Sequence, residues 1–409
     1  MRAHLELFMK RVTINMSWLR LSIFLSLALV TSGCQMLSNI TRGSDNVEPP
    51  TPLQAVDSKV EIQRLWSASA GRGTNDLYLR LQPAVTAKAV YAADGFGQVV
   101  AVDRRTGKPQ WRTHVKDRIS AGVSADRRHV VLVTGTAQVV ALDANTGQEV
   151  WRAPATTKAL APPTLAHNLV LVKTMDDVVV ALDAHTGKKR WQYQHDTTPL
   201  RLHTSSAVQV HDDYAIVGFA DGKIVILQLK TGRVMWERRI AQPRGATQLK
   251  RVVSIDANPV IERNVMYVVT FQGYLMAIEM RSGEVLWRKS FSSNTGMAIS
   301  GRYLVITDEQ GHVWALDKRN GHVFWRNQQL QARHSTAPAI ADRLVVVGDS
   351  EGYVHWLALD SGEFVARNRL TTRAPIYAPP VVRGDQVFVL NSKGVLISFK
   401  PSKKITPAG

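Results

Sequence analysis

Cysteine is almost absent from this chain, since its 409 residues include only Cys34. A single cysteine excludes an intramolecular disulfide. Long hydrophobic runs are also scarce: residues 21–33, LSIFLSLALVTSG, form the one candidate, and this run is too short to span a bilayer comfortably. Sustained apolar spacing of three and four residues is missing as well. We therefore expect an all-β fold with essentially no helices.

Acidic residues are also under-represented. The chain has 33 aspartates and glutamates against 51 lysines and arginines, which gives a net charge of +18. Residues 1–33 hold four basic residues and one acidic residue, so the remainder keeps +15. This excess favours attraction to phosphates, anionic lipid head groups or an acidic protein. A solvated basic surface explains it equally well, because the basic residues are scattered.

The N-terminal region has the order of a secretory signal: basic residues, the apolar run, then small residues. Its end, Val30-Thr31-Ser32-Gly33-Cys34, resembles the lipobox of bacterial lipoproteins. That resemblance implies a signal peptide over residues 1–33, cleavage before Cys34, and acyl chains such as palmitate on this cysteine. Gln35 follows in place of the aspartate that retains enteric lipoproteins, which implies the periplasmic face of the outer membrane. Both Met1 and Met16 fit as the start.

Residues 34–58 are mostly polar and contain Pro49, Pro50 and Pro52. This composition is typical of an extended chain without a core. We predict a lipidated, flexible tether here, a folded domain over residues 59–400, and a C-terminal tail over residues 401–409.

A repeated phrase dominates the rest of the chain. ALDANTGQEVW, at Ala141 to Trp151, has close copies that begin at Ala101, Ala181 and Ala315. Aligned on the glycine, the copies fall at Gly107, Gly147, Gly187, Gly232, Gly283, Gly321 and Gly362. Intervals of 38 to 51 residues indicate a propeller or a solenoid. Each interval contains runs of strand-forming residues, and four short strands make one propeller blade.

Each part of the phrase has a structural purpose. The carboxylate of Asp143 can accept backbone N–H groups in a tight turn, and Gly147 can adopt a positive φ there. Trp151 would lie on the outer strand and bury its ring between blades, where its N–H needs one acceptor. Ala141 leaves space for that ring. The phrase therefore predicts architecture and not catalysis.

The pattern resembles the tryptophan-docking motif of the quinoprotein-type propellers. Degenerate copies have Gln228 or Glu279 in place of the aspartate, and Ala366 stands where the seventh repeat would place its ring. An unpartnered strand, VEIQRLWSAS, carries a further tryptophan near the start and would complete the last blade. We expect an eight-bladed β-propeller with docking residues Trp66, Trp111, Trp151, Trp191, Trp236, Trp287 and Trp325.

Catalytic signals are weak. A pyrroloquinoline-quinone (PQQ) dehydrogenase shares the motif, but such enzymes are longer and generally carry a vicinal disulfide, which this chain cannot form. We find no set of calcium ligands with a catalytic base, so we expect no cofactor, no metal and no enzyme activity. His185, His195, His203 and His211 follow no zinc-ligand spacing and are interpreted as exposed loop residues. An exported chain rarely meets nucleic acid.

Taken over nearly its whole length, the chain resembles the BamB family, the lipoprotein propellers of the outer-membrane β-barrel assembly (BAM) complex. The lipobox, the tether, the eight repeats and the closing strand carry this resemblance. It implies a non-catalytic, monomeric scaffold without a small-molecule substrate. Such a scaffold binds the POTRA domains of BamA and supports the insertion of β-barrel proteins. Two alternatives stay open: a PQQ-dependent dehydrogenase, and a lipoprotein propeller that binds peptidoglycan.

The resemblance also implies two contact segments. The family's Leu-x-Leu-Arg motif corresponds to Leu200-Arg201-Leu202-His203, where the histidine departs from the pattern. Its Asp-x-Asp motif corresponds to Ser254-Ile255-Asp256, where only the second acid matches. Independently, the longest interval between repeats predicts an enlarged loop over Glu237 to Ser254, and long loops on rigid scaffolds are often functional.

Overall fold

The structure is a computed structural model that describes residues 48–74, 78–196, 205–242, 252–370 and 373–403. Every regular element in these ranges is a β-strand. Within them no helix has the length and apolar character needed to cross a membrane. A compact unit spans Pro50–Gly409 and holds all the strands.

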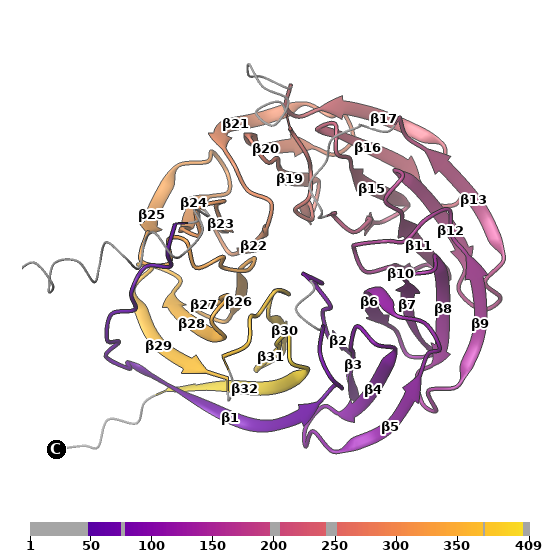
Figure 1. Ribbon diagram of the computed structural model, residues 1–409. Coiled ribbons are helices and arrows are strands. Elements are labelled where there is room, and N and C mark those ends of the chain that lie inside the picture. The colour runs from indigo at the N-terminus through magenta and orange to yellow at the C-terminus, as the bar shows by residue number, and fades with distance from the viewer. Residues whose placement is uncertain (1–47, 75–77, 197–204, 243–251, 371–372, 404–409) are drawn as a thin grey trace, which may run out of the picture. The chain divides into compact units, whose positions relative to one another are not determined.

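The strands form eight four-stranded antiparallel sheets arranged as a ring of blades (Figure 1). The prediction of an eight-bladed propeller is therefore confirmed. Blades 1 to 4 consist of β2 (Ala84–Val85), β3 (Ala89–Ala93), β4 (Gln98–Asp103), β5 (Pro109–His114); β6 (Ile119–Ala125), β7 (His129–Thr134), β8 (Gln138–Asp143), β9 (Glu149–Pro154); β10 (Thr164–Ala166), β11 (Leu169–Lys173), β12 (Val178–Asp183), β13 (Lys189–Gln194); and β14 (Gln209–His211), β15 (Tyr214–Gly218), β16 (Lys223–Gln228), β17 (Val234–Arg239).

The second half of the ring repeats this order, from the innermost to the outermost strand of each blade. Blades 5 to 8 consist of β18 (Val260–Glu262), β19 (Val265–Val269), β20 (Gly273–Glu279), β21 (Val285–Phe291); β22 (Gly296–Ser300), β23 (Tyr303–Thr307), β24 (Val313–Asp317), β25 (Val323–Asn327); β26 (Ala339–Ala341), β27 (Leu344–Gly348), β28 (Tyr353–Ala358), β29 (Phe364–Arg369); and β30 (Val381–Arg383), β31 (Gln386–Leu390), β32 (Val395–Lys403) with β1 (Val60–Ser69).

Blade 8 joins the two ends of the ring. Its outer strand is β1, which pairs antiparallel with β32 from Val60 opposite Lys403 to Ser69 opposite Val395. Figure 1 shows the indigo β1 running along the yellow β32. Because β32 continues to Lys403, the strand extends three residues beyond the predicted boundary at 400.

Position within a blade explains the sequence pattern of each strand. The third strands are apolar on both faces, and the central four residues of β8 are fully buried, because each face packs against a neighbouring blade. The outer strands alternate, and β5 exposes every second residue to solvent. The hydrophobic core is consequently divided among the blade junctions.

Tryptophans link seven of the eight blade junctions. Each indole lies on an outer strand, and its N–H donates at 2.8–3.0 Å to a backbone carbonyl in the next blade. The donors and acceptors are Trp66 and Arg104, Trp111 and Ala144, Trp151 and Ala184, Trp191 and Leu229, Trp236 and Met280, Trp287 and Lys318, and Trp325 and Leu359. In every pair the accepting residue directly follows the acid position of the repeated phrase.

The turn between the third and fourth strands prepares this docking surface. Asp143 Oδ1 accepts the N–H groups of Asn145 and Thr146 at 2.9 and 2.8 Å, which fixes the turn. Gly147 has φ of 75°, and a side chain there would collide with the Trp111 ring 2.5 Å away. The glycine is therefore required both by the backbone and by the neighbouring indole.

The junction between blades 4 and 5 is looser than the other six. A methyl group on the turn glycine would lie 2.4–2.9 Å from the docking indole at those junctions, but 3.6 Å from Trp236 at Gly283. Ile226 lies opposite Trp236, whereas alanine lies opposite the docking tryptophan in five of the other blades. The larger side chain is consistent with a ring that sits farther from its glycine.

The segment before β1 differs from the predicted tether. Thr51 N–H donates to Gln331 O at 3.1 Å, and the carbonyls of Thr51 and Gln54 accept from arginines of the ring. The polar composition predicted a free chain up to residue 58. Composition does not reveal that the backbone carbonyls of this segment accept hydrogen bonds from Arg333 and Arg367.

Candidate functional site

A cavity of about 220 Å³ lies at one end of the central opening. Seven of the eight blades contribute to its wall, through residues at or just before their innermost strands. The polar lining residues are Arg80, Gln82, Ser205, Asp256, Asn258 and Thr295, and Pro162, Pro338, Pro379 and Pro380 supply rigid apolar edges. Arg80 reaches across this region, since its Nη1 donates to Asn294 O of the loop before blade 6 at 3.2 Å.

Asp256, one of the predicted partner-binding residues, belongs to this wall. It is 6% exposed, and Ser254 Oγ donates a hydrogen bond to its Oδ2. Ser254 itself forms a backbone bridge with Phe271. The sequence predicted a partner contact at Asp256, and the structure places its carboxyl group at the central opening, where it is hydrogen-bonded within its own segment.

The segment that precedes β14 is tied to the Asp256 segment. Ser206 Oγ donates to Ile255 O at 2.9 Å, and Ala207 N–H donates to Asn258 Oδ1 at 2.8 Å. The predicted contact residues Leu200, Arg201, Leu202 and His203 lie outside the described residues, as does Cys34 with the predicted signal peptide; His203 precedes Ser206 by three positions in the chain. The described residues Ser206 and Ala207, which follow the first predicted segment in the chain, are therefore bonded to the second.

The enlarged loop predicted over Glu237 to Ser254 is shorter than expected at both ends. Glu237 and Arg239 belong to β17, and Ile240 N–H still donates to Gly222 O at 2.8 Å. The prediction counted the loop from the residue after Trp236, but the outer strand β17 continues to Arg239.

Beneath Ser206 lies a buried polar cluster that sequence reasoning missed. Lys173, 6% exposed, donates to Ser206 Oγ at 3.4 Å and to Gly218 O. His195 is only 4% exposed and stacks on Phe219 at 4.0 Å, so its interpretation as an exposed loop residue was wrong. The one signal in the sequence was a lysine closing the apolar run LVLVK.

Electrostatics hold this cluster together. His195 Nε2 lies 3.3 Å from Asp221 Oδ1, and Arg239 lies on the other side of the same carboxyl group. Burial raises the pKa of Asp221, but the hydrogen bonds from His195 and the Lys223 backbone outweigh burial and leave this pKa below its usual value. An ionised Asp221 therefore lies between the His195 ring and the Arg239 guanidinium at the edge of this cluster.

The chemistry of the site favours binding over catalysis. Among the described residues that line the cavity, Asp256 is the one carboxylate, and none is a histidine, cysteine or lysine. General acid–base catalysis usually needs a pair of titratable groups with separated pKa values. Across the described ranges, no three His, Cys, Asp or Glu side chains are grouped to hold a metal ion.

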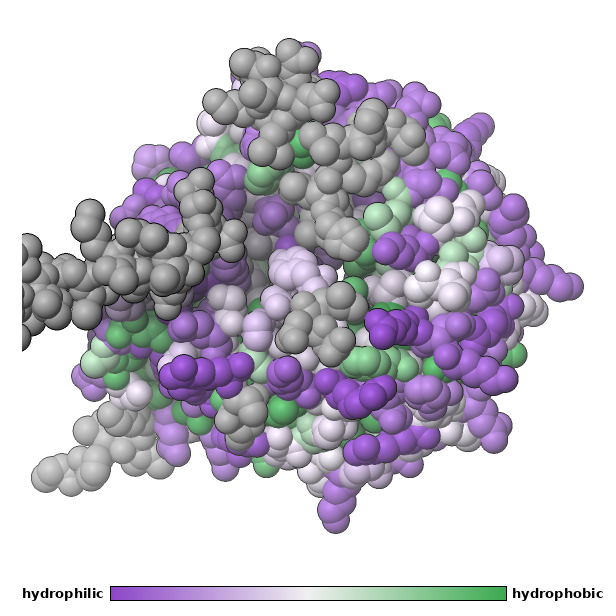
Figure 2. Space-filling view, viewed as in Figure 1, coloured by the Kyte–Doolittle hydropathy of each residue, from purple (hydrophilic) through white to green (hydrophobic). Residues whose placement is uncertain are grey.

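The exposed apolar side chains of the described surface are few and scattered. Figure 2 shows hydrophilic residues spread over this face, with small hydrophobic patches between them. In the described part of the chain, the exposed large hydrophobic side chains are Tyr78, Val150, Val234, Met235 and Leu286. A partner would consequently be held by a few anchors and not by one broad apolar face.

The closed ring, the docking tryptophans and the turn motif define a tryptophan-docked, eight-bladed propeller of the quinoprotein-like class. A family profile described as "Outer membrane protein assembly factor BamB" matches residues 53–121 and 95–327. The curated BamB of Legionella pneumophila (strain Paris) is 40% identical, over 91% of this chain and 97% of its own length. The chain belongs to the BamB family.

Solved structures agree at the level of the fold. The crystal structure of BamB from Moraxella catarrhalis superposes with a TM-score of 0.76 at 23% identity, covering 83% of this chain and all of that one. The quinohemoprotein alcohol dehydrogenase of Comamonas testosteroni gives 0.67 at 14% identity, covering 83% of this chain and 76% of that one. The likeness to the dehydrogenase is a likeness of fold alone.

Proposed function

We propose that this chain is a non-catalytic scaffold lipoprotein of the BAM complex, which binds the POTRA domains of BamA and supports the folding and insertion of outer-membrane β-barrel proteins. Membership of the BamB family supports the general role in outer-membrane protein assembly. The partner-binding surface comprises Leu200, Arg201, Leu202 and His203 together with the Asp256 segment.

One observation carries the location of this surface. The hydrogen bonds from Ser206 and Ala207 to Ile255 and Asn258 join two segments that lie about 50 residues apart in the sequence. The buried Lys173 below Ser206 supports the same region from inside. Binding segments that are held in place beforehand lose less entropy when a partner binds.

The test replaces both leucines with aspartate, as Leu200→Asp/Leu202→Asp. We expect the variant to fold normally and to lose most of its capture of BamA in a pull-down from mild detergent. The matched control is Val150→Asp/Leu286→Asp, which puts the same charges on exposed apolar positions of blades 2 and 5. Undiminished capture by the Leu200/Leu202 variant would reject this surface.

We further propose that acyl chains on Cys34 hold the protein on the periplasmic face of the outer membrane. Two lipid chains or one chain with a basic surface give stable anchoring, and the chain without residues 1–33 carries +15. Labelling with palmitate should mark the parent protein but not Cys34→Ala. Equal labelling of both would contradict lipidation at this residue.

A further inference from the structure

The segment just before β1 is bound to the ring by contacts that nothing in its own composition requires. Thr51 and Leu53 are half-buried, while Pro52 and Gln54 are exposed. Leu53 packs on the apolar cluster between blades 6 and 7, which includes Trp325 and Leu330. Thr51 N–H and Oγ1 both donate to Gln331 O, at 3.1 and 3.0 Å.

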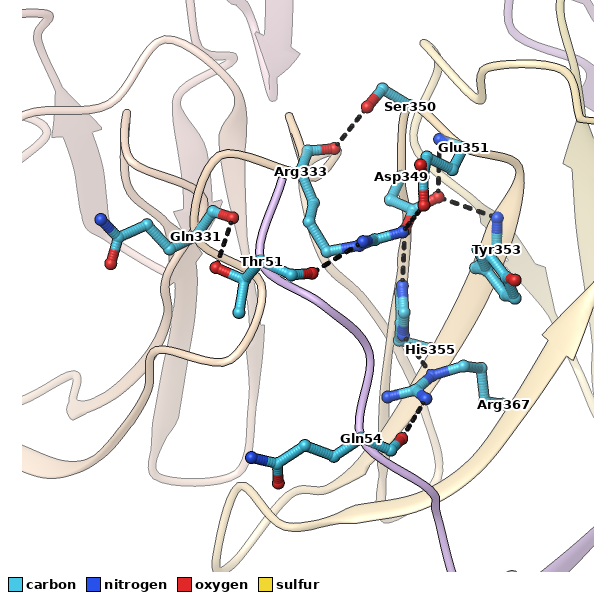
Figure 3. Close-up of polar contacts among 10 residues, drawn as sticks. All are labelled: Thr51, Gln54, Gln331, Arg333, Asp349, Ser350, Glu351, Tyr353, His355 and Arg367. Atoms are coloured by element: carbon cyan, nitrogen blue, oxygen red, sulfur yellow. Dashed lines mark hydrogen bonds and ion pairs between the residues drawn. The ribbon is translucent and has the colours of Figure 1, made fainter. Parts of the chain in front are cut away.

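Two arginines of blade 7 hold the backbone of this segment (Figure 3). Arg333 Nη1 donates to Thr51 O at 2.9 Å, and Arg367 Nη1 donates to Gln54 O at 2.6 Å. Downstream, Lys59 N–H donates to Val365 O at 2.9 Å and leads the chain into β1. The segment is therefore fixed at residues 51–54 and again at residue 59.

The arginines are themselves fixed by a buried network. Arg333 is 2% exposed, and its Nε donates to Asp349 Oδ2 at 2.8 Å while its Nη2 pairs with Glu351. Arg367 Nε donates to His355 Nδ1 at 3.1 Å, so the imidazole hydrogen lies on Nε2, 2.9 Å from Asp349 Oδ2. Asp349 Oδ1 also caps its turn by accepting the N–H groups of Glu351 and Tyr353.

This network leaves Nη1 of Arg333 for the segment. With Arg333 Nε and Nη2 committed to carboxylates, Nη1 has Thr51 O as its acceptor. Removing the segment would leave a charged N–H of a buried side chain without that acceptor, which is unfavourable. The sequence of the segment also favours its docking on the two arginines. Pro50 and Pro52 restrict the chain to extended conformations, so little entropy is lost on docking.

We propose that residues 51–54 and the pair Arg333–Arg367 form a clamp that sets where the lipidated N-terminal segment leaves the ring. The proposal rests on lipidation of Cys34. With the clamp closed, about 17 residues separate Cys34 from its first fixed point, a reach of at most roughly 60 Å. With the clamp open the first fixed point is Lys59, and the limit grows to about 90 Å. The clamp thus directs the anchor to blades 6 and 7, two and three blade positions from blade 4.

Spin-label distances test the clamp in the mature, full-length protein in mild detergent. Nitroxides are attached at Gln54→Cys, whose side chain is exposed, and at Val150→Cys in blade 2. The parent background should give one narrow distance distribution. Arg367→Gln and Leu53→Asp should each broaden it at least twofold. The control Arg343→Gln removes a blade 7 arginine that pairs with Asp360 at the surface, and it should leave the distribution narrow.

A broad distribution in the parent background, or an unchanged one in both clamp variants, would overturn the proposal. The same sample reports separately on lipidation, because an acylated Cys34 takes up no nitroxide. Two labels per chain agree with lipidation, whereas three labels would contradict it without affecting the clamp result. Arg333→Gln is only an additional variant, because Arg333 is buried and its replacement is expected to unfold the protein before it opens the clamp.

A second experiment, on the membrane-bound protein, tests whether the clamp limits the reach of the tether. Six glycine and serine residues are inserted between Val56 and Asp57, after the clamp, and energy transfer is measured from a donor at Val150→Cys to acceptor lipids. The insertion should leave the transfer unchanged in the parent and reduce it in the Arg367→Gln/Leu53→Asp background. An equal reduction in both backgrounds would show that residues 51–54 do not limit the reach of the tether.

Discussion

Trp356 and Ala366 lie directly opposite each other on β28 and β29, the reverse of Ala141 and Trp151 on β8 and β9. The reversal has a topological reason. Every docking indole donates to a turn between the third and fourth strands of the next blade. In blade 8 these strands are β32 and β1, from opposite ends of the chain, so no such turn connects them. Trp356 instead turns inward, fully buried, and donates to Asn368 Oδ1 at 2.8 Å.

This reversal predicts that exchanging the two side chains will fail. Trp356→Ala should lower the free energy of unfolding by about 3–5 kcal/mol, because it leaves a large cavity beside Phe399. In the double variant Trp356→Ala/Ala366→Trp the new indole has no turn carbonyl to bind, so about 2 kcal/mol or more of the loss should remain. Urea unfolding measures both variants. Full recovery in the double variant would contradict the explanation.

The looser junction between blades 4 and 5 predicts unequal effects of one substitution. Gly232 and Gly283 share a φ of 71°, so alanine suffers the same backbone strain at both sites. At Gly232 the methyl group would also meet the Trp191 ring at 2.5 Å, whereas at Gly283 the nearest Trp236 atom is 3.6 Å away. Gly232→Ala should therefore cost about 1–3 kcal/mol more than Gly283→Ala. Equal unfolding midpoints for the two variants would refute the role of the ring.

The turn aspartates predict acid sensitivity. The backbone N–H of Thr146 is the main cause that holds the pKa of Asp143 below its ordinary 3.8. Because the folded-state pKa is the lower one, the carboxylate stabilises the fold above about pH 4, and this stabilisation is lost as the pH falls through the folded-state pKa. Asp143→Asn keeps an acceptor but removes the charge. Its deficit against the parent should be largest at pH 7 and should shrink by pH 3, as measured by urea unfolding; a constant deficit would exclude the charge as the cause.

Buried His355 predicts a second pH effect in a different window. Burial lowers the pKa of His355 below its ordinary 6.5, and the hydrogen bond to Asp349 offsets this only in part. Below pH 6.5 the unfolded chain binds a proton that the folded chain does not, so stability should fall as the pH drops from about 7.5 to 5.5. His355→Gln should be less stable at pH 7.5 but change less over this range. Exposed His322→Gln is the control, and it should keep the parental pH dependence.

The candidate site was predictable only in part. The local phrase around Asp256 and the enlarged interval pointed to this region of the chain. The burial of Lys173 and His195 could not be read from the sequence, because their partners are distant in the chain: Lys173 bonds to Ser206 and Gly218, and His195 lies against Phe219 and Asp221. Local patterns encode strands and turns, whereas partners across a junction follow from how the blades pack.

The sequence by itself determined the repeating unit. An acid, a glycine four residues later and a tryptophan after four more specify a turn, a positive φ and a docking ring, all within eleven residues of chain. Only the tertiary structure decided why the seventh ring is missing, why one junction is loose, and where the N-terminal segment is clamped. The clamp and the closing blade depend on groups hundreds of residues apart, as when Arg333 meets Thr51, and the loose junction depends on contacts between two blades; no local periodicity carries that information.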